Sequence, residues 1–418
     1  MGMTIIEKII ARHVGEEVVP GQVVWMDLDV RSARDFGGAN VVQHFQREYG
    51  TSAVADRAKT LFTFDCVAPA VTIPYANNQQ VCREFAREQG IRVFDVDAGI
   101  GSHVMLEHGY VYPGVTVVGT DSHLNILGAV GAFGQGMGDQ DIAFAFKTGR
   151  TWFEVPETIK IVIKGLYQYP TTAKDLTLFV VGKLGAKGAL GKAVEFYGEQ
   201  IERLNLAERL TLASMATEMG AIAALLTPTE EILDYCQKRQ RPGGHVTPIS
   251  ADPDAHYCQV MELDVSGLPP QLAAPPKPSA VAPVSEYRGK AVDSVFLGSC
   301  TNGRYEDFAQ AAEFMGTRKI KSSVMAKIVP ATREVYGQLL AQGLVKRFFD
   351  AGVIVSHPGC GGCASGQIGM TGKNEVQLST SNRNFPGKQG AGDTYLVSPL
   401  TAIASAIAGE IVSPEELQ

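Results

Sequence analysis

Three of the seven cysteines lie in glycine-rich segments suited to binding a metal or an iron–sulfur cluster. Cys360 and Cys363 form a Cys-x-x-Cys pair in PGCGGCASG, and Cys300 lies in GSCTNGR. The glycines beside these cysteines leave backbone N–H groups free to point toward sulfur. On spacing alone, the pair suits a redox-active dithiol or a structural zinc site. Together with Cys300, it suits three irons of a [4Fe–4S] cluster whose fourth iron has no protein thiolate.

A second candidate group is the run Asp121, Ser122 and His123 in GTDSH. A carboxylate beside an imidazole orients the ring and raises its basicity, which suits general acid–base catalysis. A lone histidine is more often structural, so this run by itself leaves both interpretations open.

These residues follow segments that read as strands. The predicted strands include 71–74, 92–99, 115–119, 291–297, 321–331 and 352–357, and helices are predicted over 78–89, 173–184, 206–224 and 332–352. Such alternation predicts an α/β fold in which ligands bind beyond the carboxyl ends of the strands. The proline-rich segment 269–284 reads as an extended linker. We therefore predict three domains, over 1–156, 157–284 and 285–418.

Composition excludes several classes of protein. The chain has 418 residues, of which 45% are hydrophobic and 19% charged, so it is not a disordered protein. The net charge of −7 argues against a nucleic-acid-binding coat. No apolar run approaches the roughly 20 residues of a membrane span, and no export signal is recognised. The odd number of cysteines argues against a disulfide framework, so we expect a cytoplasmic protein with no membrane or nucleic-acid partner.

Several long motifs, in one order, give the chain a resemblance to a known family. They are GTDSH from Gly119, GAVGAFGQGMGDQD ending at Asp141, TGRTWFEVPET from Thr148, GSCTNGRYED from Gly298, PGCGGC from Pro358 and STSNRNFPGK from Ser379. With these motifs the chain resembles the large subunit of the aconitase-type hydro-lyases, in the branch that contains isopropylmalate dehydratase and homoaconitase. The similarity runs from Glu7 to Pro414.

The resemblance implies three α/β/α domains around one [4Fe–4S] cluster held by Cys300, Cys360 and Cys363. The fourth iron would act as a Lewis acid toward a hydroxy acid. In this family a serine in a separate swivelling domain removes the carbon-bound proton, and a Gly-Ser-Ser/Thr-Arg turn carries it. This sequence contains no such turn, so the resemblance implies a small partner subunit that supplies the swivel domain.

The resemblance also assigns roles to individual residues. It implies catalytic roles for Asp65, His103, Asp121, His123 and Glu218, and substrate contacts from Ser122, Asn302, Arg383 and Lys388. An arginine fork suits a carboxylate, as expected for Arg383. His13 is expected to pack near the site, and the remaining histidines are expected to be structural or at the surface.

Four positions depart from the family pattern. Cys66 and Arg34 stand where the family has histidine, Ser214 where it has asparagine, and Lys388 where it has arginine. We expect a hydro-lyase that dehydrates or isomerises a malate-like di- or tricarboxylate such as 3-isopropylmalate or homocitrate/homoaconitate. The departures leave open a divergent paralogue that acts on another hydroxy acid, for example a methyl-substituted malate. An iron-sensing RNA-binding protein is a further alternative, which the net charge disfavours.

Overall fold

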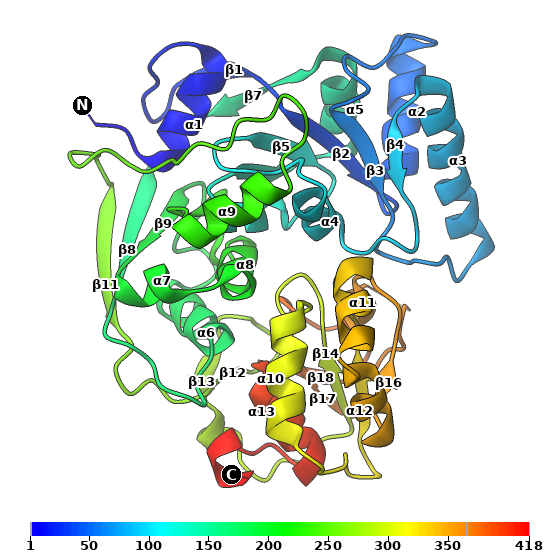
Figure 1. The fold of residues 1–418 in the computed structure, drawn as a ribbon, viewed down its shortest axis with the longest axis vertical. Coiled ribbons are helices and arrows are strands. Elements are labelled where there is room, and N and C mark those ends of the chain that lie inside the picture. Colours follow the sequence, from blue (N-terminus) through cyan, green and yellow to red (C-terminus); the bar gives the residue numbers. More distant parts are fainter. Residues whose placement is uncertain (1, 365–366, 418) are drawn as a thin grey trace.

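A computed structural model describes residues 2–364 and 367–417. In that part of the chain, three larger sheets and a two-stranded ribbon are covered by helices. Figure 1 shows the blue and cyan part at the top, the green part at the left and the yellow to red part at the bottom. The predicted α/β class is confirmed.

The first sheet has five parallel strands in the order β4-β3-β2-β5-β6. Its strands are β2 (Val30–Arg34), β3 (Thr60–Thr63), β4 (Arg92–Phe94), β5 (Thr116–Gly119) and β6 (Phe133–Gly136). The accompanying helices are α1 (Ile5–Val14), α2 (Gly38–Tyr49), α3 (Ile73–Gln89), α4 (Gly101–Glu107), η1 (Leu124–Val130) and α5 (Asp139–Thr148). Strands β1 (Val23–Asp27) and β7 (Arg150–Glu154) form a separate antiparallel ribbon.

The second sheet has four parallel strands in the order β10-β9-β8-β11. They are β8 (Thr158–Lys164), β9 (Ala193–Tyr197), β10 (Ala223–Leu226) and β11 (Gln259–Asp264). The helices of this part are α6 (Ala173–Leu184), α7 (Glu199–Arg203), α8 (Leu206–Ser214), η2 (Thr217–Met219) and α9 (Glu230–Lys238). Thr172 begins α6 through a capping box with Asp175, and the helix spans the residues 173–184 predicted from the sequence.

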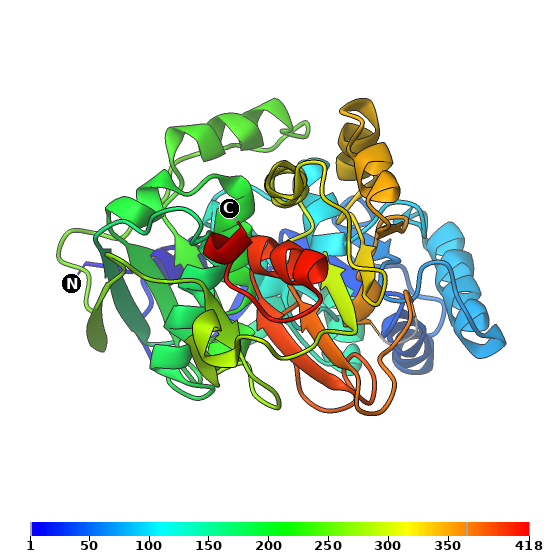
Figure 2. The same cartoon turned by 90° about the horizontal axis from the view of Figure 1, so that it is seen from below.

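The third sheet has seven strands in the order β13-β12-β18-β17-β14-β15-β16. They are β12 (Gln271–Ala273), β13 (Val281–Pro283), β14 (Ser294–Leu297), β15 (Met325–Ile328), β16 (Ile354–Val355), β17 (Val376–Ser379) and β18 (Asp393–Val397). The helices are η3 (Val284–Tyr287), α10 (Tyr305–Met315), α11 (Arg333–Ala341), α12 (Leu344–Asp350), η4 (Gly361–Cys363), α13 (Pro399–Ala408) and η5 (Pro414–Leu417). Figure 2 shows this part from below.

The linker predicted over 269–284 is wrong, because β12 and β13 both join the third sheet. They form an antiparallel hairpin, and β12 also pairs with β18. Prolines are tolerated in these short strands because β13 lies at the sheet edge. We therefore propose that the third domain begins before β12, while the boundary near residue 156 stays a prediction.

Three local predictions are also wrong. The strand predicted over 71–74 is the start of α3, because Thr72 caps the helix and Pro74 fits its first turn. The helix predicted over 206–224 ends at Ser214, and its last residues belong to strand β10. The helix predicted over 332–352 is interrupted at Gly343, whose φ of 69° is left-handed.

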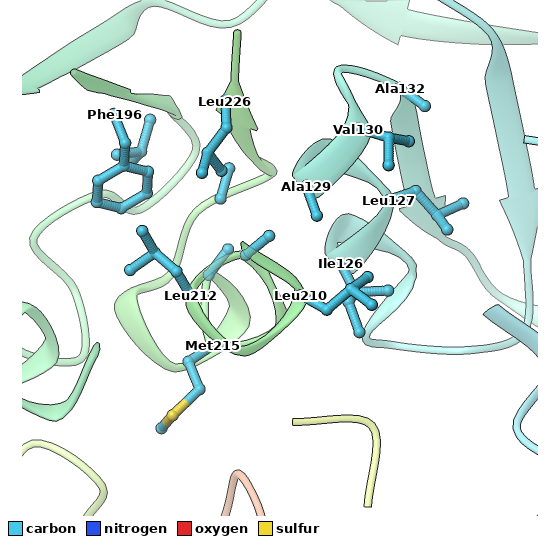
Figure 3. Close-up of a cluster of buried hydrophobic side chains, with 14 of the residues drawn as sticks. Ile126, Leu127, Ala129, Val130, Ala132, Phe196, Leu210, Leu212, Met215 and Leu226 are labelled. Carbon is cyan, nitrogen blue, oxygen red and sulfur yellow. The ribbon is translucent and has the colours of Figure 1, made fainter. Parts of the chain in front are cut away.

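The largest apolar core joins the first two parts of the chain. Ile126 of η1 lies beside Leu210 of α8, whereas Leu212 lies on the other side of α8 toward Phe196 (Figure 3). This core fixes η1, and with it the loop just before it, against the turn that follows α8. In the described residues, no helix is long and apolar enough to cross a membrane.

Candidate active site

The polar residues singled out from the sequence gather where strands of the first and third sheets end. Arg34 is the last residue of β2, Asp65 follows β3 by two residues, and Asp121 follows β5 by two. Cys300 lies in the loop after β14, and Arg383 lies in the loop after β17. Parallel strands place their carboxyl ends at one edge of a sheet, so the topology brings together loops that lie far apart in sequence.

The Cys300 loop is held in a tight conformation. The backbone of Ser299 has a φ of 73°, a value that residues other than glycine rarely adopt. Gly298 precedes it with a φ of 148°. His103 Nε2 lies 3.0 Å from the Cys300 carbonyl oxygen, and the Cys300 thiol donates to Asn382 Oδ1 at 3.3 Å. Such an unusual backbone turn is often found at binding sites.

Cys360 is the residue before the short turn η4, and Cys363 is its last residue. The Cys360 N–H donates to the Asp65 carbonyl oxygen at 2.9 Å, so this turn is tied to the loop after β3. A Cβ atom at Gly361 would lie 2.6 Å from Val329 Cγ2, which explains the need for glycine there. The neighbouring motif residues Ser365 and Gly366 lie outside the described residues.

The chemistry of these three thiols fits an iron–sulfur cluster. Burial raises the pKa of the Cys300 thiol, and the charges of Cys363 and Cys360 raise it further, so the three sulfurs share one electrostatic neighbourhood. Burial also raises the pKa of Cys363, whereas the positive charge of Lys388 acts in the opposite direction. All seven cysteines are free. Thiols kept out of disulfides and flanked by cations fit a cofactor that requires thiolate ligands.

Arg34 contacts three acceptors at the centre of the site. Its Nε donates to Asp65 Oδ1 at 2.7 Å, its Nη1 to Asp121 Oδ1 at 2.9 Å and its Nη2 to Cys360 Sγ at 2.7 Å. Burial alone would lower the pKa of Arg34, but Asp121 and Asp65 more than offset this and raise it well above its usual value. The guanidinium therefore stays charged.

Two carboxylates at the site differ in their protonation. Burial raises the pKa of Asp65 to about 6, although Arg34 opposes the shift. Burial would also raise the pKa of Asp121, but Arg34 and His123 more than offset it and lower the pKa. Asp65 is therefore able to exchange a proton near neutral pH, whereas Asp121 stays ionised.

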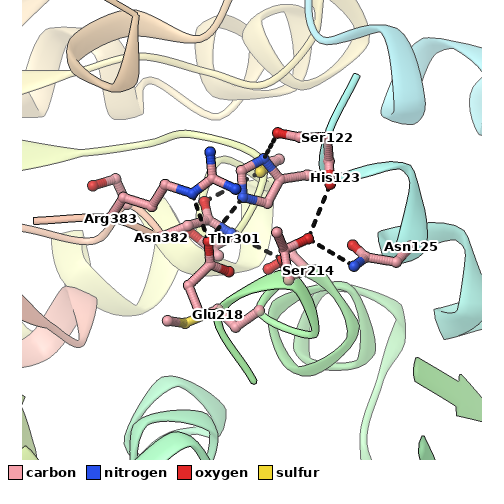
Figure 4. Close-up of polar contacts among 12 residues, drawn as sticks. Ser122, His123, Asn125, Ser214, Glu218, Thr301, Asn382 and Arg383 are labelled. Atoms are coloured by element: carbon pink, nitrogen blue, oxygen red, sulfur yellow. Dashed lines mark hydrogen bonds and ion pairs between the residues drawn. The ribbon is translucent and has the colours of Figure 1, made fainter. Parts of the chain in front are cut away.

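Glu218 joins His123 to Arg383 (Figure 4). Its Oε1 lies 3.2 Å from His123 Nε2 and accepts from Arg383 Nε at 2.8 Å. Burial would raise the pKa of Glu218, but His123 and Arg383 more than offset it and lower the pKa. Its buried Oε2 has no hydrogen-bond partner among the described residues. A buried carboxylate oxygen without a partner fits a site that receives a water or a ligand.

His103 and Asn302 both contact the loop around Cys300, and the catalytic and substrate-binding roles expected for them stay predictions. Burial lowers the pKa of His103 to about 3, helped by the positive charge of Arg304, so its imidazole is neutral while it holds the Cys300 carbonyl. Asn302 Nδ2 donates to Asp307 Oδ1 at 2.9 Å. In the described conformation both residues support the loop that carries Cys300.

The remaining predicted residues lie at the rim or outside the site. Ser122 is exposed, and its Oγ lies 3.3 Å from His123 Nδ1. Lys388 is half-buried beside Cys363. His13 does not pack near the site, because its ring bonds Asp29 at 2.6 Å and the Ile9 carbonyl oxygen.

Lys174 and Asn382 were missed by sequence reasoning. Lys174 Nζ donates to the carbonyl oxygens of Thr380 and Ser381 at 2.9 Å each, and burial lowers its pKa to about 8. Asn382 links the Cys300 thiol to the Ser214 carbonyl oxygen, where its Nδ2 donates at 3.1 Å. Asn382 lies inside a recognised motif, which was a usable signal, whereas nothing in the sequence marks Lys174.

Comparisons with known proteins agree with this arrangement. The model of the Aconitase family (aconitate hydratase) matches residues 7–290 and 283–409. The probable 3-isopropylmalate dehydratase large subunit of Methanothermobacter thermautotrophicus is 44% identical, over 100% of both chains. The probable methanogen homoaconitase large subunit of the same organism is 41% identical, over 99% of this chain and 98% of that protein.

A solved structure shares the fold. The crystal structure of Thermococcus kodakaraensis aconitase X in its holo-form has a TM-score of 0.50 with this chain at 12% identity. The match covers 90% of this chain and 89% of the other. At that identity, the likeness supports the architecture alone.

Proposed function

Since this chain belongs to the aconitase family, we propose that it is the large catalytic subunit of an iron–sulfur hydro-lyase. It is an enzyme of the aconitase-type dehydratases, and its relatives include 3-isopropylmalate dehydratase and homoaconitase large subunits. The substrate is a malate-like hydroxy di- or tricarboxylate such as 3-isopropylmalate or homocitrate/homoaconitate. The enzyme works in the cytoplasm.

The observation that carries the proposal is the convergence of three free cysteines with the acid–base residues. Cys300, Cys360 and Cys363 would hold a [4Fe–4S] cluster through three of its irons. When bound, the cluster would supply a Lewis acid that polarises the substrate hydroxyl. The surrounding side chains bind the substrate carboxylates and move protons.

Arg383 and Lys388 are suited to binding substrate carboxylates. The Arg383 guanidinium makes one contact to Glu218 through Nε and keeps its two terminal nitrogens for a carboxylate. The charge of Lys388 lies beside Cys363 on the same side of the site. A substrate with two carboxylates would be held at both.

His123 is the group best placed to give a proton to the departing hydroxyl. Glu218 fixes its Nε2, and Asp121 Oδ1 accepts from its backbone N–H at 3.0 Å. A positioned imidazole contributes roughly 100- to 10,000-fold as a general acid or base. Asp65, whose pKa is about 6, provides a second site for a proton.

The base that removes the carbon-bound proton would come from a small subunit with a swivel domain. Relatives that match the whole chain carry the words large subunit, which implies such a partner. The exposed Phe36 and Phe385, which follow Arg34 and Arg383 in sequence, leave apolar surface at the rim for this partner.

The first experiment tests the cluster. Cys300→Ser, Cys360→Ser and Cys363→Ser should each remove the broad visible absorbance of the reconstituted protein, because a hydroxyl is a poor replacement for a thiolate ligand. Cys82→Ser and Cys236→Ser are matched controls, since both cysteines are buried away from the site. Full cluster content in all three ligand variants would refute the assignment.

The second experiment tests the missing base. The large subunit alone should hold a cluster but dehydrate no hydroxy acid, and addition of the small subunit should restore turnover. The assay follows the ultraviolet absorbance of the unsaturated product with 3-isopropylmalate, homocitrate and methyl-substituted malates in parallel. Substantial turnover by the large subunit alone would show that the base lies within this chain.

A further inference from the structure

We propose that Arg34 is a positioning residue that, with the Cys66 thiol, sets the reduction potential of the cluster through the Cys360 sulfur. This inference rests on the proposed function, because it requires that Cys360 holds a cluster. It concerns two positions at which this sequence departs from the family pattern. The proposed function does not depend on it.

The geometry of Arg34 joins the cysteine to both carboxylates. Each of its three guanidinium nitrogens has a different acceptor, at 2.7 Å on Asp65, 2.9 Å on Asp121 and 2.7 Å on the Cys360 sulfur. Its side chain is only 14% exposed. Its backbone N–H donates to Thr120 Oγ1 at 2.9 Å, so the end of β2 that carries it is fixed within the sheet.

Cys66 places a second polar group, its thiol, close to the same sulfur. The ligand atoms of Asp65, Cys66 and Cys360 all lie within 4.8 Å of one another, so the Cys66 thiol is a neighbour of the Cys360 sulfur. Backbone N–H groups of the loop, including that of Cys66 at 3.0 Å, donate to the Asp35 carboxylate. The thiol is therefore held by a rigid loop, beside a sulfur that already accepts from Arg34.

The same three ligand atoms do not favour a separate cation. Arg34 already occupies lone pairs of Asp65 and Cys360 with a permanent positive charge, which would repel a divalent ion. A cysteine sulfur that accepts from a charged guanidinium and lies beside a second thiol is instead suited to ligating a cluster whose electron density is to be adjusted.

The positive charge of Arg34 should make the cluster easier to reduce. Reduction adds one negative charge to a cluster, and hydrogen bonds to its sulfurs together with nearby positive charge stabilise that added charge. Arg34 supplies both, and its buried position limits screening by water. Loss of this contact should therefore make the cluster harder to reduce. Loss of the weaker S–H donor of Cys66 should act in the same direction with a smaller effect.

The test is a redox titration of the reconstituted large subunit, with dithionite as reductant and the paramagnetic signal of the reduced cluster as readout. The variants are Arg34→Gln, Arg34→Lys and Cys66→Ala. At the potential where half of the parent clusters are reduced, Arg34→Gln should lower the ratio of reduced to oxidised cluster at least tenfold, which is 59 mV for a one-electron couple. Arg34→Lys keeps the positive charge but loses the planar guanidinium, so its ratio of reduced to oxidised cluster should lie between those of the parent and Arg34→Gln. Cys66→Ala should lower the ratio about threefold.

Matched controls separate this effect from a general loss of structure. Arg83→Gln removes an arginine that pairs with Asp95 in the same part of the fold, and Cys82→Ser removes a buried thiol of α3. Both should titrate as the parent does. If Arg34→Gln fails to fold, Arg34→Lys and Cys66→Ala decide the outcome.

The two possible failures are distinguishable. A parent protein that never acquires a cluster would refute the proposed function. Clusters present in normal amount, with Arg34→Lys and Cys66→Ala both titrating within twofold of the parent, would overturn the inference and leave the proposed function standing.

Discussion

Replacement of Glu218 by glutamine is the sharpest test of the acid–base arrangement. The change keeps the shape of the side chain and removes the charge that joins His123 to Arg383. At the 2.8 Å separation from Arg383 Nε, the attraction is worth roughly 6 kcal/mol at an effective dielectric constant of about 20, before desolvation is subtracted. Its loss releases both partners from their fixed orientations.

We expect kcat of the complete enzyme to fall at least 100-fold, about 2.7 kcal/mol of transition-state stabilisation, because His123 loses the group that orients it. KM for the hydroxy acid should not rise, because Arg383 becomes freer to bind a carboxylate. Arg383→Lys should do the opposite and raise KM about tenfold or more, since the bidentate fork is lost.

The measurement is steady-state dehydration by large and small subunits together, with cluster content and circular dichroism checked for each variant. Glu195→Gln is the matched control, because Glu195 is also fully buried but bonds Tyr197, Tyr257 and the backbone of Ile5. A Glu218→Gln enzyme whose kcat lies within tenfold of the parent would refute the reasoning. So would a large rise in KM at unchanged kcat.

Three further predictions concern the site and its support. Cys66→Ala should lower the rate less than about tenfold, whereas His123→Ala should lower it at least 100-fold, and equal losses would make Cys66 the acid. Burial raises the pKa of Asp307 from 3.8 to about 7, so the native carboxylate loses its proton at higher pH than the unfolded one. Relative to Asp307→Asn, the parent should thus lose about 4 kcal/mol of unfolding free energy as the pH rises from 4 to 8 in urea titrations, and a gain would contradict the shift. Arg304→Met should lower the unfolding free energy by about 3–5 kcal/mol, because it leaves the buried Glu107 carboxylate without its partner. Adding Glu107→Leu should recover most of this loss. An unchanged urea midpoint for Arg304→Met would show that the pair contributes no stability.

Local patterns in the sequence determined much of the architecture. The alternation of apolar runs and helical stretches predicted the α/β class and the helix over 173–184, which is α6. The family motifs carried the resemblance. Each of these signals resides within a few neighbouring residues, so a single sequence is enough to read it.

Local reasoning failed where the partner of a segment lies far away in sequence. The prolines of 269–284 indicated a linker, but pairing with β18, more than a hundred residues later, makes part of it a strand. The apolar run after Leu206 resembled one helix, because buried helices and buried strands have the same composition. Only the neighbouring strand β9 decides that its end is β10.

For the site, too, the sequence supplied the residue types and only the tertiary structure supplied their contacts. The sequence identified the thiols, the carboxylates and the imidazoles as residue types, and the motifs placed them in one family. The sequence could not show that Arg34 touches Asp65, Asp121 and Cys360 at once, because these contacts span 31, 87 and 326 residues. Nor could it show that burial lowers the pKa of His103 to about 3 and raises that of Asp65 to about 6. Charge–charge contacts and desolvation depend on distances through space, and those are set only when the ends of parallel strands from separate sheets are packed against one another.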